Sequence, residues 1–178
     1  FDSVGRNGKL LLNVPPTRDG LFHENDVRAL KEFADKRRAL FSGGNLLSGA
    51  RVRASAEGGG HAPASVLDGD ADSYWDAGGK HSGWLEFETP RDIEFDVIEL
   101  QEAIAHGQNI ANYRIERWND GAWMPLAWGT TIGHKKLERI EPVRARKLRL
   151  SIDYGYGPVR ITKVAVYRSA ARPAPEAA

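Results

Sequence analysis

The sequence predicts a mainly β protein, a jelly-roll β-sandwich preceded by one strand and one helix. Short segments of alternating apolar and polar residues follow one another over residues 45–169, which is typical of antiparallel sheets with one buried face. In contrast, residues 9–14 form an apolar run without alternation, and the residues after Glu24 carry apolar side chains at helical spacing. We therefore divide the chain into 1–44, 45–169 and a Pro/Ala-rich tail, 170–178, which we expect to be disordered.

The composition allows a folded core and excludes several classes of function. Hydrophobic residues make up 41% of the 178 residues, and the formal net charge is +1. Nucleic-acid binding is not expected, because it usually needs a basic stripe. No apolar run approaches the ~20 residues needed to span a bilayer, so we expect no membrane partner. The chain has no cysteine, which excludes disulfides and thiolate metal sites, and its five histidines lack the spacing of a transition-metal motif.

Residues 1–44 predict a buried strand followed by a helix. The run 9–14 suits a strand buried on both faces of a parallel sheet, and two prolines end it. The helix begins near Glu24, has acidic residues in its first turn and basic residues near its end, and stops at two glycines. One strand and one helix bury too little surface to fold alone. We expect them to belong to a larger unit; the alternative is a small α+β arm packed on the next domain.

The segment 45–169 predicts short antiparallel strands. In the clearest example Leu148, Leu150 and Ile152 alternate with polar residues, the period of a half-buried strand. Spacing of this kind predicts a sandwich or jelly roll. The candidate strands are 50–54, 84–88, 95–102, 112–118, 136–140, 147–152 and 161–167.

The central part of this segment predicts a β-meander over residues 97–137. Asp120-Gly121 predicts the hairpin turn within it, because this pair tolerates the positive φ of a tight turn. Trp75 ends the stretch DGDADSYW and Trp84 lies in GWLEFE, and we interpret both as core residues.

Two polar clusters accompany these strands. Gln101-Glu102 is followed by Gly107-Gln108, and residues 129–135 read GTTIGHK. The pattern QE…GQ…W…GTTIGxK resembles the C-terminal domain of family 29 α-L-fucosidases, particularly the plant-like branch that acts on α-1,3/1,4-linked fucose. The stretch NLLSGARVRASAEGGGHAPASVLDGDADSYW resembles the start of a discoidin-type, galactose-binding-like β-sandwich.

This resemblance implies what each part of the chain does. Residues 1–44 would be the last strand and helix of the catalytic (β/α)8 barrel, and 45–169 a discoidin-like sandwich that packs on the barrel. The parent would remove terminal α-L-fucose from glycans with retention, through an Asp nucleophile and a carboxylic acid/base. In the family both groups lie upstream of this chain's first residue, so no catalytic residue is assigned here and the chain alone should be inactive.

The resemblance also sets expectations about context. The chain begins at Phe1 without an initiator Met, and we expect it to be a piece of a longer protein. Its partners would be the remainder of the barrel and, through the parent enzyme, fucosylated glycans. The location would be extracellular, periplasmic or lysosome-like.

The polar residues near the strand ends have a structural interpretation. We expect Gln101, Glu102 and Gln108 to hydrogen-bond backbone groups where the sandwich meets the barrel, because buried polar groups must be paired. Asn13 ends the predicted barrel strand, and barrel active sites gather at strand C-termini. A role near the sugar and a cap on the following loop are both open for Asn13.

The alternative function is a carbohydrate-binding module that anchors the enzyme to glycans. A pyranose site needs an aromatic ring for stacking, rimmed by hydrogen-bonding groups. The candidate residues are the loop residues Tyr154, Tyr156, His81 and His106, with Tyr74 also in a loop. A purely structural interaction domain is a third alternative.

The resemblance finally implies a calcium loop. Many discoidin-like domains bind a structural Ca²⁺ in the matching loop. The matching ligands here would be the carbonyl of Ser65, the carboxylates of Asp68 and Asp70, and Ser73. Oxygen ligands in a tight loop suit Ca²⁺. A Glu commonly completes the shell, but the matching position here is Lys163. We expect the Lys163 ammonium to reach toward Asp68 or Asp70 in place of the ion, so no cofactor is required and a structural Ca²⁺ is the alternative.

Overall fold

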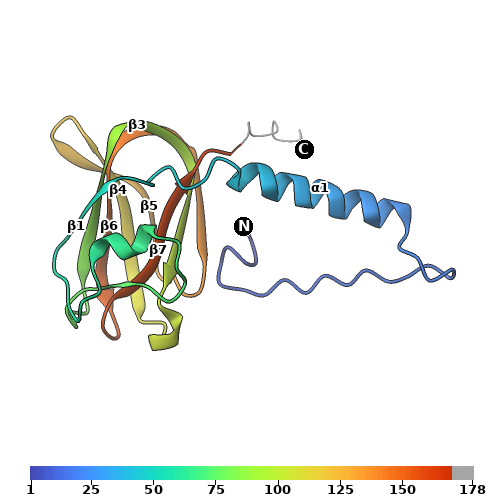
Figure 1. Ribbon diagram of the computed structural model, residues 1–178, viewed down its shortest axis with the longest axis horizontal. Coiled ribbons are helices and arrows are strands. Elements are labelled where there is room, and N and C mark those ends of the chain that lie inside the picture. The colour runs from blue at the N-terminus through green and yellow to red at the C-terminus, as the bar shows by residue number, and fades with distance from the viewer. Residues whose placement is uncertain (170–178) are drawn as a thin grey trace.

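The computed structural model describes residues 1–169, and it shows a β-sandwich from which one helix and one extended segment project (Figure 1). The predicted tail, 170–178, lies outside the described residues. In chain order the elements are α1 (Glu24–Phe41), β1 (Arg51–Ala54), η1 (Pro63–Leu67), β2 (Trp75–Asp76), β3 (Gly83–Glu102), η2 (Ile104–His106), β4 (Ile110–Asn119), β5 (Ala122–Gly129), β6 (Lys136–Gly155) and β7 (Arg160–Tyr167).

Two long strands, β3 and β6, pair with each other and pass through both layers of the sandwich. The first half of β3 also pairs with β1 and its second half with β7, with a register shift against β6 between Glu88 and Ile93. Phe87 from the first half and Ile98 from the second belong to the same buried core. The sheet order β2-β7-β3-β6-β4-β5 therefore folds over on itself and encloses one core.

The sequence predicted pairs of short strands where the structure has two continuous ones. Segments 84–88 and 95–102 are parts of β3, and segments 136–140 and 147–152 are parts of β6. Exposed polar residues at the bends interrupt the alternation, so the continuity of each strand is not visible in the local pattern.

The predicted meander is correct in one half and wrong in the other. Strands β4 and β5 form the expected hairpin, with Asp120 at φ 47° and Gly121 at φ 88° in the turn. However, β3 and β4 are not neighbours, because β6 pairs with both and lies between them. The correction arises from a long-range pairing that local spacing does not reveal.

The two tryptophans interpreted as core residues have different environments. Trp75 is fully buried, as expected, but Trp84 is partly exposed. Leu85 and Phe87 take the inner face of β3, so alternation places Trp84 on the outer face, where its ring centroid lies 5.2 Å from the Arg149 guanidinium. The core interpretation of Trp84 is therefore wrong.

Helix α1 forms as predicted but buries none of its side chains. Its N-cap is His23, whose Nδ1 accepts a hydrogen bond from the backbone N–H of Asn25 at 3.2 Å. Phe33, on the apolar stripe, is 55% exposed. No helix of residues 1–169 is long and apolar enough to cross a membrane.

Residues 9–14, the predicted parallel strand, are extended but belong to no strand of the described sheet. Leu11 is 95% exposed, and Asn13 is exposed as well. A parallel strand needs neighbours on both sides, and residues 1–169 supply none for this segment. Its place in a barrel stays a prediction.

The end of α1 attaches to the outer face of the β3–β7 layer. The Phe41 ring packs edge-on against Tyr167, with centroids 5.0 Å apart, and Phe1 lies 4.1 Å from the Arg139 guanidinium. These residues join a second apolar cluster around the buried Val97. The sandwich thus holds the base of the projecting segment and leaves the rest of it uncovered.

The bend of β3 is held by a buried hydroxyl. Thr89 is 2% exposed, and its Oγ1 lies 2.7 Å from the carbonyl oxygen of Arg91 and 3.0 Å from that of Arg146. The hydroxyl therefore links the bend of β3 to β6.

We predict that Thr89→Val lowers the free energy of unfolding by about 1–3 kcal/mol, because valine keeps the shape but removes the buried hydroxyl and its hydrogen bonds to the two carbonyls. Thr130→Val is the matched control at an exposed position, with an expected change within about 0.5 kcal/mol. Urea unfolding of both variants measures the difference. Equal midpoints for the two variants would contradict the assignment.

Candidate functional site

The loops that carry the predicted sugar-binding residues meet at one end of the sandwich (Figure 1). The carbonyl of Asn109 accepts a hydrogen bond from the N–H of Tyr156 at 2.8 Å, and its Nδ2 donates to the carbonyl of Pro158 at 3.3 Å. The N–H of Val159 donates to the carbonyl of Lys80 at 2.9 Å. These bonds connect the segment after η2, the β6–β7 loop and the β2–β3 loop.

Two exposed tyrosines stand at this end of the sandwich. Tyr156 lies in the β6–β7 loop, as predicted, whereas Tyr154 belongs to the end of β6 and pairs with Asn112, so its predicted loop position is wrong. Tyr154 is 51% exposed and Tyr156 is 76% exposed, and their rings meet edge-on with centroids 5.6 Å apart. A Cβ on the intervening Gly155 would lie 3.2 Å from the carbonyl oxygen of His81 and 3.1 Å from that of Asn109. Because the backbones of His81, Asn109 and residue 155 approach one another so closely, residue 155 must be small, which favours glycine. The same approach places the backbone of His81, one of the predicted residues, beside the two tyrosines.

His106 contacts a different ring. Its centroid lies 4.9 Å from that of Tyr74, and His61 stacks on the same tyrosine at 3.9 Å with nearly parallel planes. The sequence analysis did not single out His61 for sugar binding, because its glycine-rich loop has no informative spacing. The rings of His106 and Tyr74 thus contact each other, which covers part of each ring.

The predicted calcium ligands are brought together in part. The Ser73 hydroxyl lies 2.8 and 2.7 Å from the two Asp68 carboxylate oxygens and 3.3 Å from the carbonyl of Ser65. The Asp70 carboxylate instead accepts a hydrogen bond from the N–H of Asp72 at 2.9 Å. Residues 1–169 contain no cluster of three or more His, Cys, Asp or Glu side chains suited to a metal. Calcium binding stays a prediction, which the effect of added Ca²⁺ on Tm would test.

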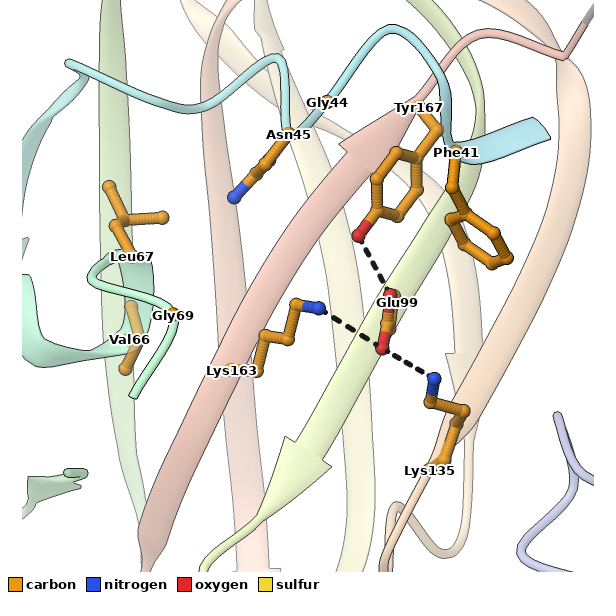
Figure 2. Close-up of a pocket in the computed structure, with 10 residues that line it drawn as sticks. All are labelled: Phe41, Gly44, Asn45, Val66, Leu67, Gly69, Glu99, Lys135, Lys163 and Tyr167. Carbon is orange, nitrogen blue, oxygen red and sulfur yellow. Dashed lines mark hydrogen bonds and ion pairs between the residues drawn. The ribbon is translucent and has the colours of Figure 1, made fainter. Parts of the chain in front are cut away.

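Lys163 does not act as expected. Its ammonium lies 3.4 Å from the carboxylate of Glu99 and points away from the loop at Gly69 (Figure 2). The expectation that it reaches Asp68 or Asp70 is therefore wrong. Glu99 is 1% exposed, and a buried carboxylate needs nearby cations more than exposed carboxylates do.

Glu99 is the centre of a buried polar network (Figure 2). Lys135 Nζ lies 3.0 Å from Oε1, and the Tyr167 hydroxyl donates to Oε2 at 2.8 Å. Gln101 Nε2 donates to Oε1 at 2.6 Å. Above this network, beside the end of α1, lies a pocket of about 360 Å³.

The network shifts the pKa values of its members. Burial raises the pKa of Glu99, but the Tyr167 hydrogen bond and the charges of Lys135 and Lys163 outweigh it, so that the pKa lies below its ordinary value of 4.5. Burial and the neighbouring Glu99 carboxylate raise the pKa of Tyr167. Glu99 is therefore held as a carboxylate inside the protein.

Glu102, at the end of β3, binds backbone groups as predicted. Its Oε1 accepts from the N–H groups of Asn109 at 2.7 Å and Ile110 at 3.0 Å, and its Oε2 accepts from that of Gly133 at 2.6 Å. One carboxylate thereby connects the segment after η2 with the GTTIGHK segment. The three hydrogen bonds that this carboxylate accepts within residues 1–169 all come from backbone N–H groups.

The other two residues of this prediction bind side chains instead of backbone. Gln101 donates to Glu99, and Gln108 Oε1 accepts a hydrogen bond from Asn7 Nδ2 at 2.8 Å. Asn7 Oδ1 in turn accepts from the N–H of His134 at 2.7 Å. Asn7, at φ 64°, thus fastens the N-terminal segment to both polar clusters. The sequence analysis missed it, because its partners lie more than a hundred residues away.

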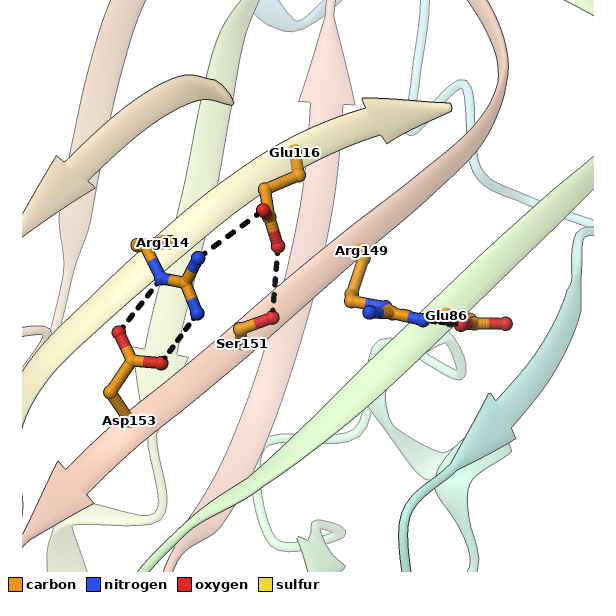
Figure 3. Close-up of polar contacts among 6 residues, drawn as sticks. All are labelled: Glu86, Arg114, Glu116, Arg149, Ser151 and Asp153. Atoms are coloured by element: carbon orange, nitrogen blue, oxygen red, sulfur yellow. Dashed lines mark hydrogen bonds and ion pairs between the residues drawn. The ribbon is translucent and has the colours of Figure 1, made fainter. Parts of the chain in front are cut away.

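A third polar feature, on the outer face of the layer that contains β4, was also missed (Figure 3). Asp153 accepts two hydrogen bonds from Arg114, at 2.9 and 2.8 Å, and Ser151 donates to Glu116 at 3.1 Å. Alternation along YRIERW could have indicated that Arg114 and Glu116 share a face.

Next to it, Arg149 pairs with Glu86 and lies between two tryptophan rings, 5.2 Å from Trp84 and 4.2 Å from Trp123. The guanidinium is thus enclosed by an ion pair and two cation–π contacts. Because these charged groups already have partners, we assign this face a role in stabilising the sheet.

Comparison with known proteins identifies the family of this chain. Residues 51–165, well over half of the chain, match the F5/8 type C domain. The chain belongs to this family. It is also similar to alpha-L-fucosidase 1 of Arabidopsis thaliana, with 36% identity over 161 residues that cover 86% of this chain and 32% of that protein. The F5/8 type C domain of this chain is therefore a fucosidase-associated one.

Solved structures also match this chain, among them a fucosidase. A GH29 fucosidase of Ruminococcus gnavus in complex with fucose superposes with a TM-score of 0.87 and 34% identity, covering 96% of this chain and 35% of that chain. CBM32 domains of Clostridium perfringens ZmpB share the fold, with a TM-score of 0.59 and 13% identity over 66% of this chain and 34% of theirs. The chain thus spans about a third of the length of the fucosidases that it matches.

We predict that Glu99→Gln lowers the free energy of unfolding by about 3 kcal/mol at pH 7, because two lysines lose their buried partner. The folded pKa of Glu99 is lowered, so its contribution is present above pH 4.5 and is lost as the pH falls through the folded pKa. The difference from wild type should therefore shrink below pH 4.5. Urea unfolding between pH 3 and 7 measures it, with the exposed Glu88→Gln as control. A pH-independent difference would contradict the network.

Proposed function

We propose that this chain is the C-terminal segment of a retaining α-L-fucosidase, in which residues 1–44 complete the catalytic (β/α)8 barrel and the sandwich packs on it. The coverage of the Ruminococcus gnavus fucosidase structure carries this proposal. Residues 45–169 make up 125 of 178 residues, or about 70% of the chain, so a match over 96% includes most of residues 1–44. The projecting segment therefore has a counterpart in a complete fucosidase.

The exposed apolar surface of this segment supports the same proposal. Leu10, Leu11 and Leu12 are 54%, 95% and 59% exposed, and Phe22 and Phe33 are 57% and 55% exposed. Several large apolar side chains exposed on one segment indicate an interface. Neighbouring strands and helices of a barrel are the partner that would cover it on both sides.

The direct test is an activity assay on the protein that contains this chain together with its upstream barrel. That protein should hydrolyse an aryl α-L-fucoside with retention at the anomeric carbon, which NMR of the first-formed sugar reports. The chain of residues 1–178 alone should show no hydrolysis. Activity of the short chain, with the longer enzyme excluded by mass spectrometry, would overturn the proposal.

A second candidate, a carbohydrate-binding module, is favoured by the loop cluster. Tyr154 and Tyr156 present exposed rings at one end of the sandwich, the backbone of His81 approaches Gly155 between them, and His106 lies at the same end. An aromatic surface with neighbouring polar groups suits a pyranose ring. The proposed ligand is a neutral sugar of the glycans on which the parent would act.

We predict that Phe33→Ala distinguishes a barrel helix from a free arm. In the isolated chain the change in stability should stay within about 0.5 kcal/mol, because Phe33 is 55% exposed. In the complete protein the same substitution should cost about 3–5 kcal/mol, because the ring would be buried in the barrel. Glu32→Ala, on the polar side of α1, is the control. Equal effects of Phe33→Ala in both proteins would argue for a free arm.

We predict that the loop cluster binds neutral oligosaccharides weakly and that Tyr156→Ala removes this binding. Titration with fucosylated and galactosylated oligosaccharides, followed by chemical-shift changes in NMR, measures it. Trp128→Ala is the matched control, because Trp128 is equally exposed at 77% but lies on β5. Unchanged spectra at millimolar sugar, or equal loss in both variants, would count against a module.

A further inference from the structure

A chemically labile pair lies where the N-terminal arm, residues 1–44, leaves the sandwich. Asn7 and Gly8 form the one Asn-Gly pair of the 178-residue sequence. Because glycine has no Cβ, its backbone nitrogen can approach the preceding asparagine side chain closely. Attack of this nitrogen on the carboxamide carbon is the first step of deamidation.

The carboxamide of Asn7 is held at both ends by distant segments. Its Nδ2 donates to Gln108 Oε1 at 2.8 Å, and its Oδ1 accepts from the N–H of His134 at 2.7 Å. A Cβ on Gly133, which has φ 66°, would lie only 2.4 Å from Nδ2, so the carboxamide packs directly on this glycine. The carboxamide cannot turn toward the nitrogen of Gly8 without leaving these contacts.

The attacking nitrogen is held as well. The N–H of Gly8 donates to the carbonyl of Ser3 at 2.9 Å, and the N–H of Asn7 donates to the carbonyl of Lys135 at 3.0 Å. The backbone of the pair is thus fixed to its own turn and to the sandwich. Deamidation therefore requires a local opening of residues 5–8, and its rate should follow the population of the open form.

We propose that Asn7 is a deamidation site that the attachment of the arm to the sandwich protects. In the open form the Gly8 nitrogen bonds to the side-chain carbonyl carbon of Asn7, the bond from that carbon to Nδ2 breaks, and ammonia leaves with the proton of Gly8. Water then opens the five-membered imide at one of its two carbonyls and leaves aspartate or isoaspartate at position 7. Solvent water is the only co-reactant, and no atom is oxidised or reduced.

Either product weakens the attachment. A carboxylate cannot donate to Gln108 Oε1, and isoaspartate adds one carbon to the main chain directly before residues 9–14. The opening is reversible but the reaction is not, so the modified arm accumulates. If residues 9–14 are a barrel strand, modification moves this strand relative to the sandwich. Only this consequence, and not the site, rests on the proposed function.

Peptide mapping by mass spectrometry tests the site in the chain of residues 1–178, as a gain of about 1 Da on the peptide that contains residue 7. At mildly alkaline pH, Gly133→Ala should raise the rate about tenfold, because the new Cβ displaces the carboxamide from its partners. Gly49→Ala is the matched control. Its φ of 79° gives a similar backbone cost, but within residues 1–169 no atom lies within 4 Å of the added Cβ, so the rate should stay within about twofold.

Gln108→Ala is a second variant that adds no Cβ to left-handed backbone. It removes only the acceptor of Asn7 Nδ2 and should raise the rate about fivefold. In urea, where the contacts are absent, all variants and wild type should react at one common, faster rate.

Three outcomes would overturn the inference. A native wild-type rate equal to the rate in urea would show that the fold does not protect Asn7. Wild-type rates in both Gly133→Ala and Gln108→Ala would show that these contacts are not the protection. In the complete protein, hydrolysis of an aryl α-L-fucoside should fall as the isoaspartate content at position 7 rises, and full activity after modification would overturn the consequence for the barrel. A wild-type protein inactive on every fucoside would overturn the proposed function and leave the mass measurements, and the site, unaffected.

Discussion

The pairing of β3 with β6 is the interaction on which the remaining structure depends. Each strand has 20 residues, and together they run through both layers, so every other strand pairs directly or indirectly with one of them. Because the same two strands contribute to both layers, the inner residues of both halves share one core. The buried Thr89 hydroxyl stabilises the bend that this geometry requires.

The second half of β3 also organises the junction with the N-terminal segment. Ile98 and Leu100 face the core, whereas Glu99 faces outward beneath the end of α1 and gathers two lysines. At the end of the strand a register shift precedes Glu102, which fastens two polar loops to each other. The arm attaches beside this half of β3, through Phe41 on Tyr167 and Asn7 on Gln108.

The sandwich buries its apolar side chains in its own core, whereas the arm leaves its apolar side chains exposed. Within residues 1–169 no buried side-chain polar atom lacks a hydrogen-bond partner, and the sandwich encloses its own core. The arm leaves its leucines and phenylalanines in solvent. A domain with a complete core, joined to an arm whose apolar side chains are uncovered, is the arrangement expected if the arm belongs to a neighbouring barrel.

The sequence alone determined the fold class, α1, the Asp120-Gly121 hairpin and the backbone role of Glu102, because alternation, helical spacing and turn chemistry are local signals. Only the tertiary structure decided that β6 separates β3 from β4, that Lys163 binds Glu99, and that Asn7 reaches across the chain. Those features depend on which distant segments become neighbours. Burial then selects the partner of each charge, and no local pattern encodes that choice.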